Sequence, residues 1–281
     1  MKQIGILYHP QRPDSCRLAE EIDILLADSG RETWHGVAAD EEGLRAAAAQ
    51  LELLITLGGD GTIMRAARAV AAERVPIVGV NLGRLGFLAE VEPEDVARAF
   101  PRLLAGDYTI EERMMLHVEL QRQGALLLQT EAVNEAFVGR GRVSRMAQVS
   151  VQVDGYQMMT QNGDGLIVCT PTGSTAYCLS AGGPIVAPDV DCLTITPVAP
   201  HLSLAHAVVV PGSRRLCLEL LSGQDAMLSV DGHVDTEMLP GDRVYCEASA
   251  HRARFVRLGT DGAFYETVLR RLRWPDRSWT T

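Results

Sequence analysis

The chain has 281 residues, of which 47% are hydrophobic, 22% charged and 5% aromatic, and its formal net charge is -10. An acidic chain with few aromatic residues lacks the basic surface that binds nucleic acid or anionic lipid, so we expect neither nucleic acid nor a membrane as a partner. The length exceeds that of one typical hydrophobic core and predicts two domains.

The cysteines and the first residues indicate the compartment. None of the six cysteines belongs to a Cys-x-x-Cys pair or a zinc-spaced cluster, so we expect free thiols at Cys16, Cys169, Cys178, Cys192, Cys217 and Cys246. The opening apolar run over residues 4–8 is too short for a signal peptide, and no stretch reaches the length of a membrane span. We therefore expect a cytoplasmic protein.

Strand and helix patterns alternate through the N-terminal part of the chain. Apolar runs predict buried strands at residues 4–8, 53–57 and 77–80. Helical spacing predicts helices at residues 15–28, 40–50, 62–73 and 93–105. Such alternation is typical of a parallel sheet with helical crossovers, so residues 1–105 are predicted to form an α/β, Rossmann-like domain, to which residues 254–281 return.

The pattern changes after Gly106 to short β-type runs. Strands are predicted at residues 115–120, 126–129, 148–153, 165–170, 208–210, 216–220 and 244–248. Turn dipeptides such as Asp154-Gly155 and Asp231-Gly232 separate them. Residues 106–253 are therefore predicted to form a second, β-rich domain, a β-sandwich.

A glycine-rich loop, Gly58-Gly59-Asp60-Gly61-Thr62, follows the predicted strand 53–57. Glycines let backbone amides approach an oxyanion, and a helix beginning with Thr62 as its N-cap would add a partial positive charge. Asp60 would repel a phosphate unless it accepts a proton from an attacking hydroxyl or positions a metal ion. The alternative is a plain turn that uses Asp-Gly for its tolerance of positive φ.

A second candidate loop follows the strand after Asp164 and reads Thr170-Pro171-Thr172-Gly173-Ser174-Thr175-Ala176-Tyr177. Its hydroxyl groups suit hydrogen bonding to a polar ligand. The alternative is a structural connection in which the hydroxyls cap the next helix.

Taken together, these loops resemble the NAD kinase family over nearly the whole chain. The matching segments are residues 58–62, 79–88, 134–135, 164–177, 180–184, 200–201, 230–232 and 269–274. The glycine loop by itself is shared with diacylglycerol-type lipid kinases, and in a variant form with phosphofructokinases. The block that ends at Tyr177 narrows the resemblance to NAD kinases.

The resemblance implies transfer of the terminal phosphoryl group of ATP, bound with Mg²⁺ or another divalent cation, to the adenosine ribose 2′-hydroxyl of NAD, which gives NADP. Polyphosphate is an alternative donor. Asp60 is implied as the proton acceptor, and no side chain is assigned as a metal ligand. The implied substrate- and nucleotide-binding positions are Gly58, Gly59, Gly61, Thr62, Asn134, Glu135, Arg145, Asn162, Asp164, Thr175, Ala176, Tyr177, Ser180 and His233.

Within this set, Asn134 and Glu135 are implied to hold the adenosine, the segment from Thr175 to Ser180 the adenine, and Asp164 the nicotinamide half. The physical alternatives are a solvated strand end for the Asn134-Glu135 pair and an ordinary surface cation for Arg145. The family is further implied to form homodimers or homotetramers through the β-rich domain.

Two positions depart from the family pattern. Asn162 stands where relatives often have arginine, which removes a cation near the substrate and leaves the preference between NAD and NADH open. His206-Ala207 replaces a frequent Arg-Pro, a change expected to be structural.

Two rival functions stay open. A lipid kinase would need an apolar entrance or a membrane-binding face, and the sequence has neither an amphipathic basic helix nor a large cationic patch. A non-catalytic dinucleotide sensor would have no use for a base at the position of Asp60.

Overall fold

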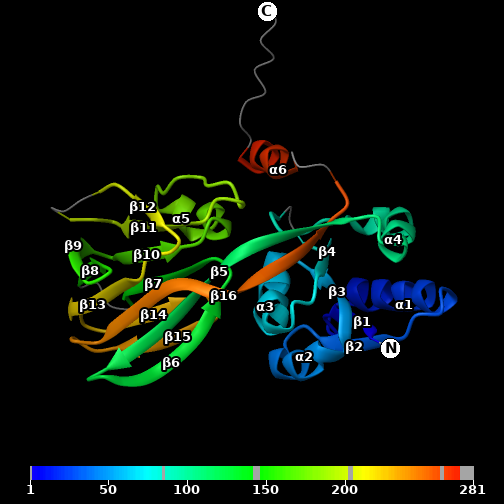
Figure 1. Cartoon of the computed structure of the whole chain (residues 1–281), viewed down its shortest axis with the longest axis horizontal. Helices are drawn as coiled ribbons and strands as arrows, with labels where there is room; N and C mark the ends of the chain where they lie inside the picture. Colours follow the sequence, from blue (N-terminus) through cyan, green and yellow to red (C-terminus); the bar gives the residue numbers. More distant parts are fainter. Residues whose placement is uncertain (1, 84–85, 142–145, 202–204, 260–262, 273–281) are drawn as a thin grey trace, which may run out of the picture. The chain divides into compact units, whose positions relative to one another are not determined.

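The computed structural model describes residues 2–83, 86–141, 146–201, 205–259 and 263–272. The chain divides into two compact units (Figure 1). The first unit consists of the chain up to Glu112 together with the chain from Ala253 onward, and the second unit consists of Arg113 to Arg252. Strands β5 (Thr109–Arg122) and β16 (Arg243–Arg257) each run from one unit into the other.

A parallel sheet forms the centre of the first unit, which confirms the predicted α/β fold. Its strands lie in the order β2-β1-β3-β4, namely β2 (Thr33–Val37), β1 (Gln3–Tyr8), β3 (Leu51–Gly58) and β4 (Ile77–Asn81). Phe255, near the end of β16, pairs in parallel with Ile77. Strand β2 lies at the sheet edge and was not predicted, because Gly36 is its single buried residue.

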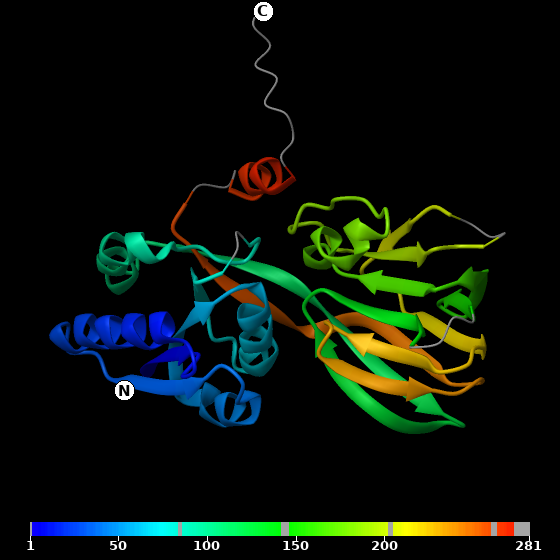
Figure 2. The ribbon, with the colours of Figure 1, turned by 180° about the vertical axis from the view of Figure 1, so that it is seen from behind.

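Helices cover both faces of this sheet (Figure 2). They are α1 (Pro13–Asp28), α2 (Glu41–Ala47), α3 (Asp60–Val70) and α4 (Val96–Ala105), with 3-10 turns at Ala48–Gln50, Ala71–Glu73 and Pro93–Asp95. Val78 and Val80 share one apolar cluster with α1 and α4, whereas a side chain at Gly79, between them, would meet Ile63 of α3. Because successive strand residues point to opposite faces, α3 covers the face opposite α1 and α4.

The second unit is a sandwich of two antiparallel sheets, which confirms the predicted β-rich fold. One sheet has the order β12-β11-β10-β7-β14-β15, with strands β12 (Val208–Pro211), β11 (Cys192–Val198), β10 (Gly165–Cys169), β7 (Glu135–Arg140), β14 (Ala226–Val230) and β15 (Val234–Met238). In the other, β16 pairs with β5 and with β13 (Leu216–Ser222), and the remaining strands are β6 (Ala125–Ala132), β8 (Ala147–Val153) and β9 (Tyr156–Gly163).

Apolar side chains of both sheets form one core in the second unit. Leu116, Val151 and Leu218 contribute from one sheet, and Val138 and Leu228 from the other. All five are fully buried, so the residues at the strand ends are carried on a close-packed support. After β10 come a 3-10 turn, Thr172–Thr175, and the short helix α5 (Tyr177–Ser180).

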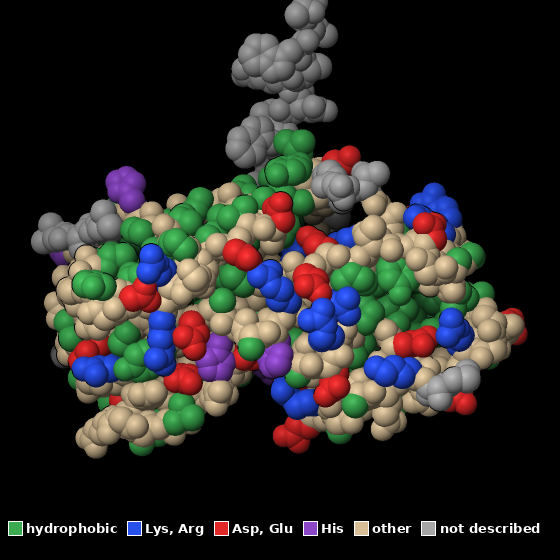
Figure 3. All heavy atoms as spheres, viewed as in Figure 1, with side chains coloured by type: hydrophobic (Ala, Val, Ile, Leu, Met, Phe, Trp, Pro, Cys, Tyr) green, Lys and Arg blue, Asp and Glu red, His purple; other side chains and the backbone are tan. Residues whose placement is uncertain are grey.

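Acidic and basic side chains are interleaved over the face of the molecule seen in Figure 3. Within the first unit, for example, Arg257 pairs with Glu111 at 2.6 Å, and within the second unit Arg243 pairs with Glu219 at 3.1 Å. None of the helices in the described ranges is both long enough and apolar enough to cross a membrane.

Candidate functional site

The glycine loop lies at the carboxyl end of β3, whose residues from Leu53 to Gly58 are all buried. The structure corrects the predicted helix start: α3 begins at Asp60, its N-cap is Gly59, and no side chain caps it. Thr62 therefore lies inside the first turn and is buried rather than capping the helix. An uncapped helix N-terminus offers N–H groups and a partial positive charge to an anion, and the first-turn carboxylate of Asp60 is stabilised there.

The Asp60 carboxylate is held by the chain segment that follows β4. The backbone N–H of Phe87 donates to Asp60 Oδ2 at 2.9 Å, and the N–H of Leu88 donates to Oδ1 at 3.2 Å. A Cβ atom at Gly86 would collide with this carboxylate. Glycine at position 86 therefore leaves the space in which the Asp60 side chain lies.

The segment that follows β4 is also hydrogen-bonded to the glycine loop. The N–H of Leu82 donates to the carbonyl of Gly58 at 3.1 Å, and Asn81 Oδ1 accepts the N–H of Gly83 at 3.1 Å. The match at residues 79–88 therefore marks a segment that orients Asp60, a role that the sequence did not reveal.

Arg271 is a second neighbour of Asp60 that the sequence did not predict as a site residue. It lies in the last turn of helix α6 (Ala263–Leu272), and its Nη1 is 3.5 Å from Asp60 Oδ2. Its guanidinium lies over the ring of Phe87, 4.5 Å from the ring centroid. The sequence shows a basic stretch at residues 269–274, but no local pattern indicates that Arg271 lies beside Asp60.

His9 is also at this strand edge, because it follows the carboxyl end of β1. Its Nε2 is 3.0 Å from the hydroxyl of Thr62, and its backbone N–H donates to Ser15 Oγ. Burial, followed by the charges of Arg12 and Arg65, lowers the pKa of His9. The carboxyl ends of parallel strands meet at one edge of a sheet. Because His9 follows one predicted strand and the glycine loop follows another, the sequence could have placed His9 near this loop.

In the second unit, Asn134 lies between β6 and β7, and Glu135 begins β7. The Asp231 carboxylate accepts the backbone N–H groups of Val133 and Asn134 at 2.9 Å each and that of Glu135 at 3.2 Å. The N–H of Asp231 donates back to the Glu135 carbonyl. The turn before β7 is thus fixed by the matching segment at residues 230–232.

Thr170 binds this turn from the other side. Its hydroxyl donates to the Val133 carbonyl at 2.6 Å, and its N–H donates to the Asn134 carbonyl at 2.9 Å. The same hydroxyl accepts the N–H of Gly173 at 3.2 Å, at the start of the 3-10 turn. Thr170 is completely buried, so the structural alternative accounts for this residue.

The other hydroxyls of the loop divide into two groups. Ser174 is completely buried and donates to the Pro171 carbonyl at 2.6 Å. Thr175 donates to the Thr172 carbonyl at 3.2 Å but is partly accessible, as is Ala176. Neither the 3-10 turn nor α5 has a side-chain hydrogen bond from its N-cap residue. The end of the loop, from Thr175 onward, is therefore the part that a ligand can reach.

Glu135 is a buried carboxyl, only 9% exposed, and its Oε2 has no hydrogen-bond partner. Burial, and next the negative charge of Asp231, raise the pKa of Glu135 to about 8. At pH 7 the protonated form of this carboxyl therefore predominates, and that form can both donate and accept a hydrogen bond.

Asp164 and Tyr177 lie near this turn. Arg140 Nη2 donates to Asp164 Oδ2 at 2.7 Å, and the Asp164 N–H donates to the Val198 carbonyl at 3.0 Å. The Tyr177 ring is 5.7 Å from that of Phe137 and is 42% exposed. Partial burial, followed by the charge of Asp164, raises the pKa of Tyr177.

The remaining predicted residues of this unit lie at strand and helix ends. Asn162 is in β9, and its carbonyl accepts the N–H of His201 at 2.8 Å. Ser180 ends α5 and is exposed, and His233 lies between β14 and β15, where its N–H donates to the Val230 carbonyl. Arg145 lies outside the described residues.

No group of three or more His, Cys, Asp or Glu side chains is placed to bind a metal ion by itself in the described part of the chain. Magnesium in nucleotide sites is commonly held by one or two carboxylates together with substrate phosphates. The single carboxylate of Asp60 fits a cation that arrives with a nucleotide rather than one bound by a cage of side chains.

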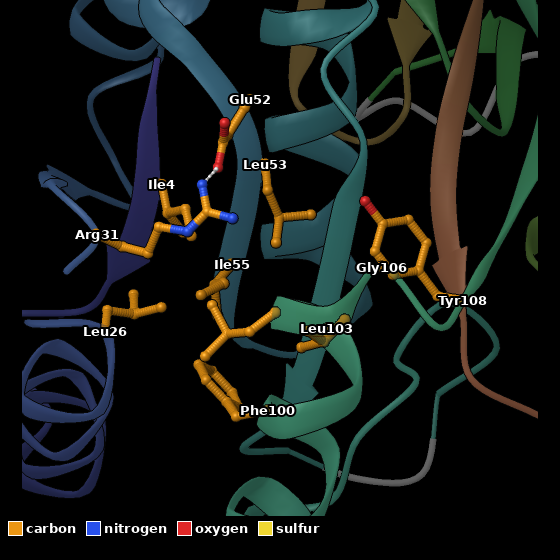
Figure 4. A pocket seen from close by; sticks show the side chains of 11 residues that line it. Ile4, Leu26, Arg31, Glu52, Leu53, Ile55, Phe100, Leu103, Gly106 and Tyr108 are labelled. Atoms are coloured by element: carbon orange, nitrogen blue, oxygen red, sulfur yellow. Dashed lines mark hydrogen bonds and ion pairs between the residues drawn. The ribbon is translucent and has the colours of Figure 1, made fainter. Parts of the chain in front are cut away.

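A hollow of about 240 Å³ occurs elsewhere in the first unit (Figure 4). Arg31 and Glu52 pair at 2.9 Å on one side of it. Its other lining residues are Ile4, Leu26, Leu53, Ile55, Phe100, Leu103, Leu104, Gly106 and Tyr108. Ile4 and Leu53 lie near the amino ends of β1 and β3, whereas Asp60 follows the carboxyl end of β3. None of the candidate site residues lines this hollow.

Two family patterns match the chain. The ATP-NAD kinase N-terminal domain matches residues 28–108, and the ATP-NAD kinase C-terminal domain matches residues 133–258. A protein named NAD kinase from Dehalococcoides mccartyi (strain CBDB1) is 36% identical over 278 residues, which cover 99% of this chain and 98% of the relative. Another so named, from Heliobacterium modesticaldum, is 40% identical over 269 residues, covering 92% and 94%.

Solved structures share the fold. Yeast NADH kinase complexed with NADH superimposes with a TM-score of 0.86 at 23% identity, covering 100% of this chain and 90% of the other. An NAD kinase from Archaeoglobus fulgidus in complex with ATP has a TM-score of 0.73 at 25% identity, with 95% and 96% covered.

Proposed function

The chain belongs to the ATP-NAD kinase family, and from that premise we propose that it phosphorylates the adenosine ribose 2′-hydroxyl of NAD with ATP to give NADP. The observation that carries the proposal is the Asp60 carboxylate, held by two backbone N–H groups at the uncapped start of α3. A plain turn would not require a neighbouring segment to orient its aspartate.

Asp60 acts in this proposal as the proton acceptor. The 2′-oxygen of NAD bonds to the terminal phosphorus of ATP, and the bond from that phosphorus to the bridging oxygen breaks with its electron pair leaving on ADP. The hydroxyl proton passes to Asp60. Positioning and charge neutralisation dominate such transfers, and a general base contributes about 10²- to 10⁴-fold in rate.

The phosphoryl donor is proposed to bind at the start of α3. A side chain placed on Gly59 or Gly61 would meet no atom within 4 Å, so the loop leaves open space for phosphate oxygens. Mg²⁺ bound with the donor would neutralise part of the phosphate charge. Polyphosphate is an alternative donor for the same site.

The second unit is proposed to bind NAD through the accessible end of the Thr170–Tyr177 loop and through the turn at Asn134. Asp164 and Tyr177 are partly exposed, and the neutral acid of Glu135 can donate a hydrogen bond to an acceptor on the ligand. A homodimer or homotetramer and a cytoplasmic location stay predictions of the sequence.

The test is formation of NADP from NAD and ATP with Mg²⁺ by the purified chain and by Asp60→Asn. The variant keeps the size of the side chain but turns one of the two oxygens that accept from Phe87 and Leu88 into a donor. We therefore expect a folded chain of somewhat lower thermal stability and a turnover about 10²- to 10⁴-fold lower. Near-normal NADP formation by the variant would contradict the base assignment. NADH, polyphosphate and a diacylglycerol are offered in parallel, and phosphorylation of the lipid alone would contradict the proposed function.

A further inference from the structure

Arg271 and Asp60 form an ion pair that stability does not explain. The 3.5 Å separation is longer than a good hydrogen bond, and the Arg271 side chain is 41% exposed. Exposed ion pairs contribute little to stability, and the two backbone N–H groups already fix the carboxylate. The position of Arg271 therefore calls for a different explanation.

The guanidinium is held in place by an aromatic ring. It lies 4.5 Å from the centroid of the Phe87 ring, and the backbone N–H of Phe87 donates to Asp60. A guanidinium stacked on a ring keeps its N–H edges available for a second partner. One residue, Phe87, thus positions both the proton acceptor and a cation beside it.

The glycine loop needs such a cation. It carries a carboxylate where a phosphate has to approach, and the start of α3 supplies only a partial positive charge. Lys2 is the single lysine of the chain, so a basic side chain that adds to this charge has to be an arginine. Two nearby arginines already have close partners: Arg12 pairs with Asp14 at 2.6 Å and donates to the Leu82 carbonyl at 2.7 Å, and Arg65 donates to the Ala38 carbonyl at 2.9 Å. Arg271 lies beside the Asp60 carboxylate at the longer distance of 3.5 Å, and a phosphoryl group can replace that partner.

We propose that Arg271 binds the phosphoryl group in transfer and stabilises its charge in the transition state, an inference that rests on the proposed function. When the terminal phosphoryl group of ATP reaches the glycine loop, the guanidinium shifts from Asp60 Oδ2 to the phosphoryl oxygens. This movement places positive charge where negative charge develops and frees a lone pair of Asp60 for the proton of the hydroxyl.

The experiment compares Arg271→Ala, Arg271→Lys and the matched control Arg270→Ala, which changes the adjacent residue of the same helical turn. We expect Arg271→Ala to lower kcat about 10²- to 10³-fold with NAD affinity unchanged in a direct binding measurement. Arg271→Lys should recover part of this loss, and added guanidinium ion should raise the turnover of Arg271→Ala and leave that of Arg270→Ala unchanged. A kcat of Arg271→Ala close to that of Arg270→Ala would overturn the proposal.

A double-mutant cycle separates phosphoryl binding from mere pairing with Asp60. If Arg271 only held the carboxylate, Arg271→Ala would have no further effect in the Asp60→Asn background. The proposal expects the residual turnover of Asp60→Asn to fall again. The parent chain is the reference for both conclusions: absence of NADP formation by the parent refutes the proposed function, whereas an active parent with an unimpaired Arg271→Ala refutes this inference alone.

Discussion

The carboxylate of Asp231 accepts the backbone N–H of Asn134 at 2.9 Å, across two segments that are far apart in the sequence. The same carboxylate accepts the N–H groups of Val133 and Glu135. Asp231 itself adopts a positive φ of 50°, a conformation that aspartate tolerates better than most residues. The presentation of Asn134 and Glu135 thus depends on one partly buried carboxylate.

Asp231→Asn is therefore expected to weaken both the fold and NAD binding. The amide nitrogen of asparagine would face the N–H of Val133, so one acceptor becomes a donor. Hydrogen bonds to charged groups contribute about 1.5–3 kcal/mol each, and we expect the free energy of unfolding to fall by about that amount. Urea denaturation and a titration with NAD measure the two effects.

The matched control for Asp231→Asn is Asp235→Asn, since Asp235 is an exposed residue of the adjacent strand β15. It removes the same charge without touching the turn before β7. Equal losses of stability in the two variants would show that net charge, not the turn, is responsible.

Glu135 makes the stability of the fold depend on pH. Its pKa is about 8 in the folded chain against 4.5 in an exposed carboxyl, so the folded chain binds one more proton than the unfolded chain between these values. The free energy of unfolding therefore falls as the pH rises through this window, by up to about 1.4 kcal/mol per pH unit. The full contribution of the neutral acid is present below pH 4.5 and is lost by the time the pH exceeds the folded pKa.

Glu135→Gln should remove this dependence, because glutamine does not titrate. We expect the variant to match the parent near pH 5 and to be the more stable of the two by a few kcal/mol at pH 8. Urea denaturation without NAD at several pH values gives the comparison, since other titrating groups contribute equally to both chains. Parallel pH curves for the two chains would rule out a buried neutral acid at position 135.

How far the fold could be predicted depended on whether each strand forms an uninterrupted apolar run. Strands β3 and β4 are apolar and buried on both faces, and their runs were visible in the sequence. The unpredicted strands of the second unit are β7, β9, β11, β14 and β15. Strand β9 carries Gln157, Thr160 and Gln161, and β15 alternates with Asp235 and Glu237, so neither forms an apolar run.

The candidate site shows the same limit. The Asp60 loop was visible because its pattern is local, with a buried strand, glycines and a helix in sequence. The contacts of Asp60 with Gly86, Phe87 and Arg271 depend on tertiary packing, which no local pattern encodes. The sequence therefore identified the segments of the candidate site. The structure showed which of these segments contact one another.

Gly86→Ala tests whether the position of the Asp60 carboxylate matters for turnover. The added methyl group would collide with that carboxylate and force it to move. A misplacement of about 1 Å at a reacting group can cost about 10²-fold in rate, which is the loss of kcat that we expect. Gly259→Ala is the control, since its methyl group would lie 3.8 Å from Glu90, an ordinary contact. Normal kcat in Gly86→Ala would mean that the carboxylate can move without consequence.

Tyr177 is expected to contribute to NAD affinity through its ring rather than its hydroxyl. The ring is 42% exposed and lies 5.7 Å from that of Phe137, tilted by 58°, so part of it is accessible to a ligand. Stacking of a base on an aromatic ring contributes about 1–3 kcal/mol, and Tyr177→Ala should weaken NAD binding by about that free energy. Tyr177→Phe keeps the ring and should bind NAD as the parent does. If both variants lost affinity equally in calorimetric titrations, the hydroxyl would be the contact, and the stacking role would have to be abandoned.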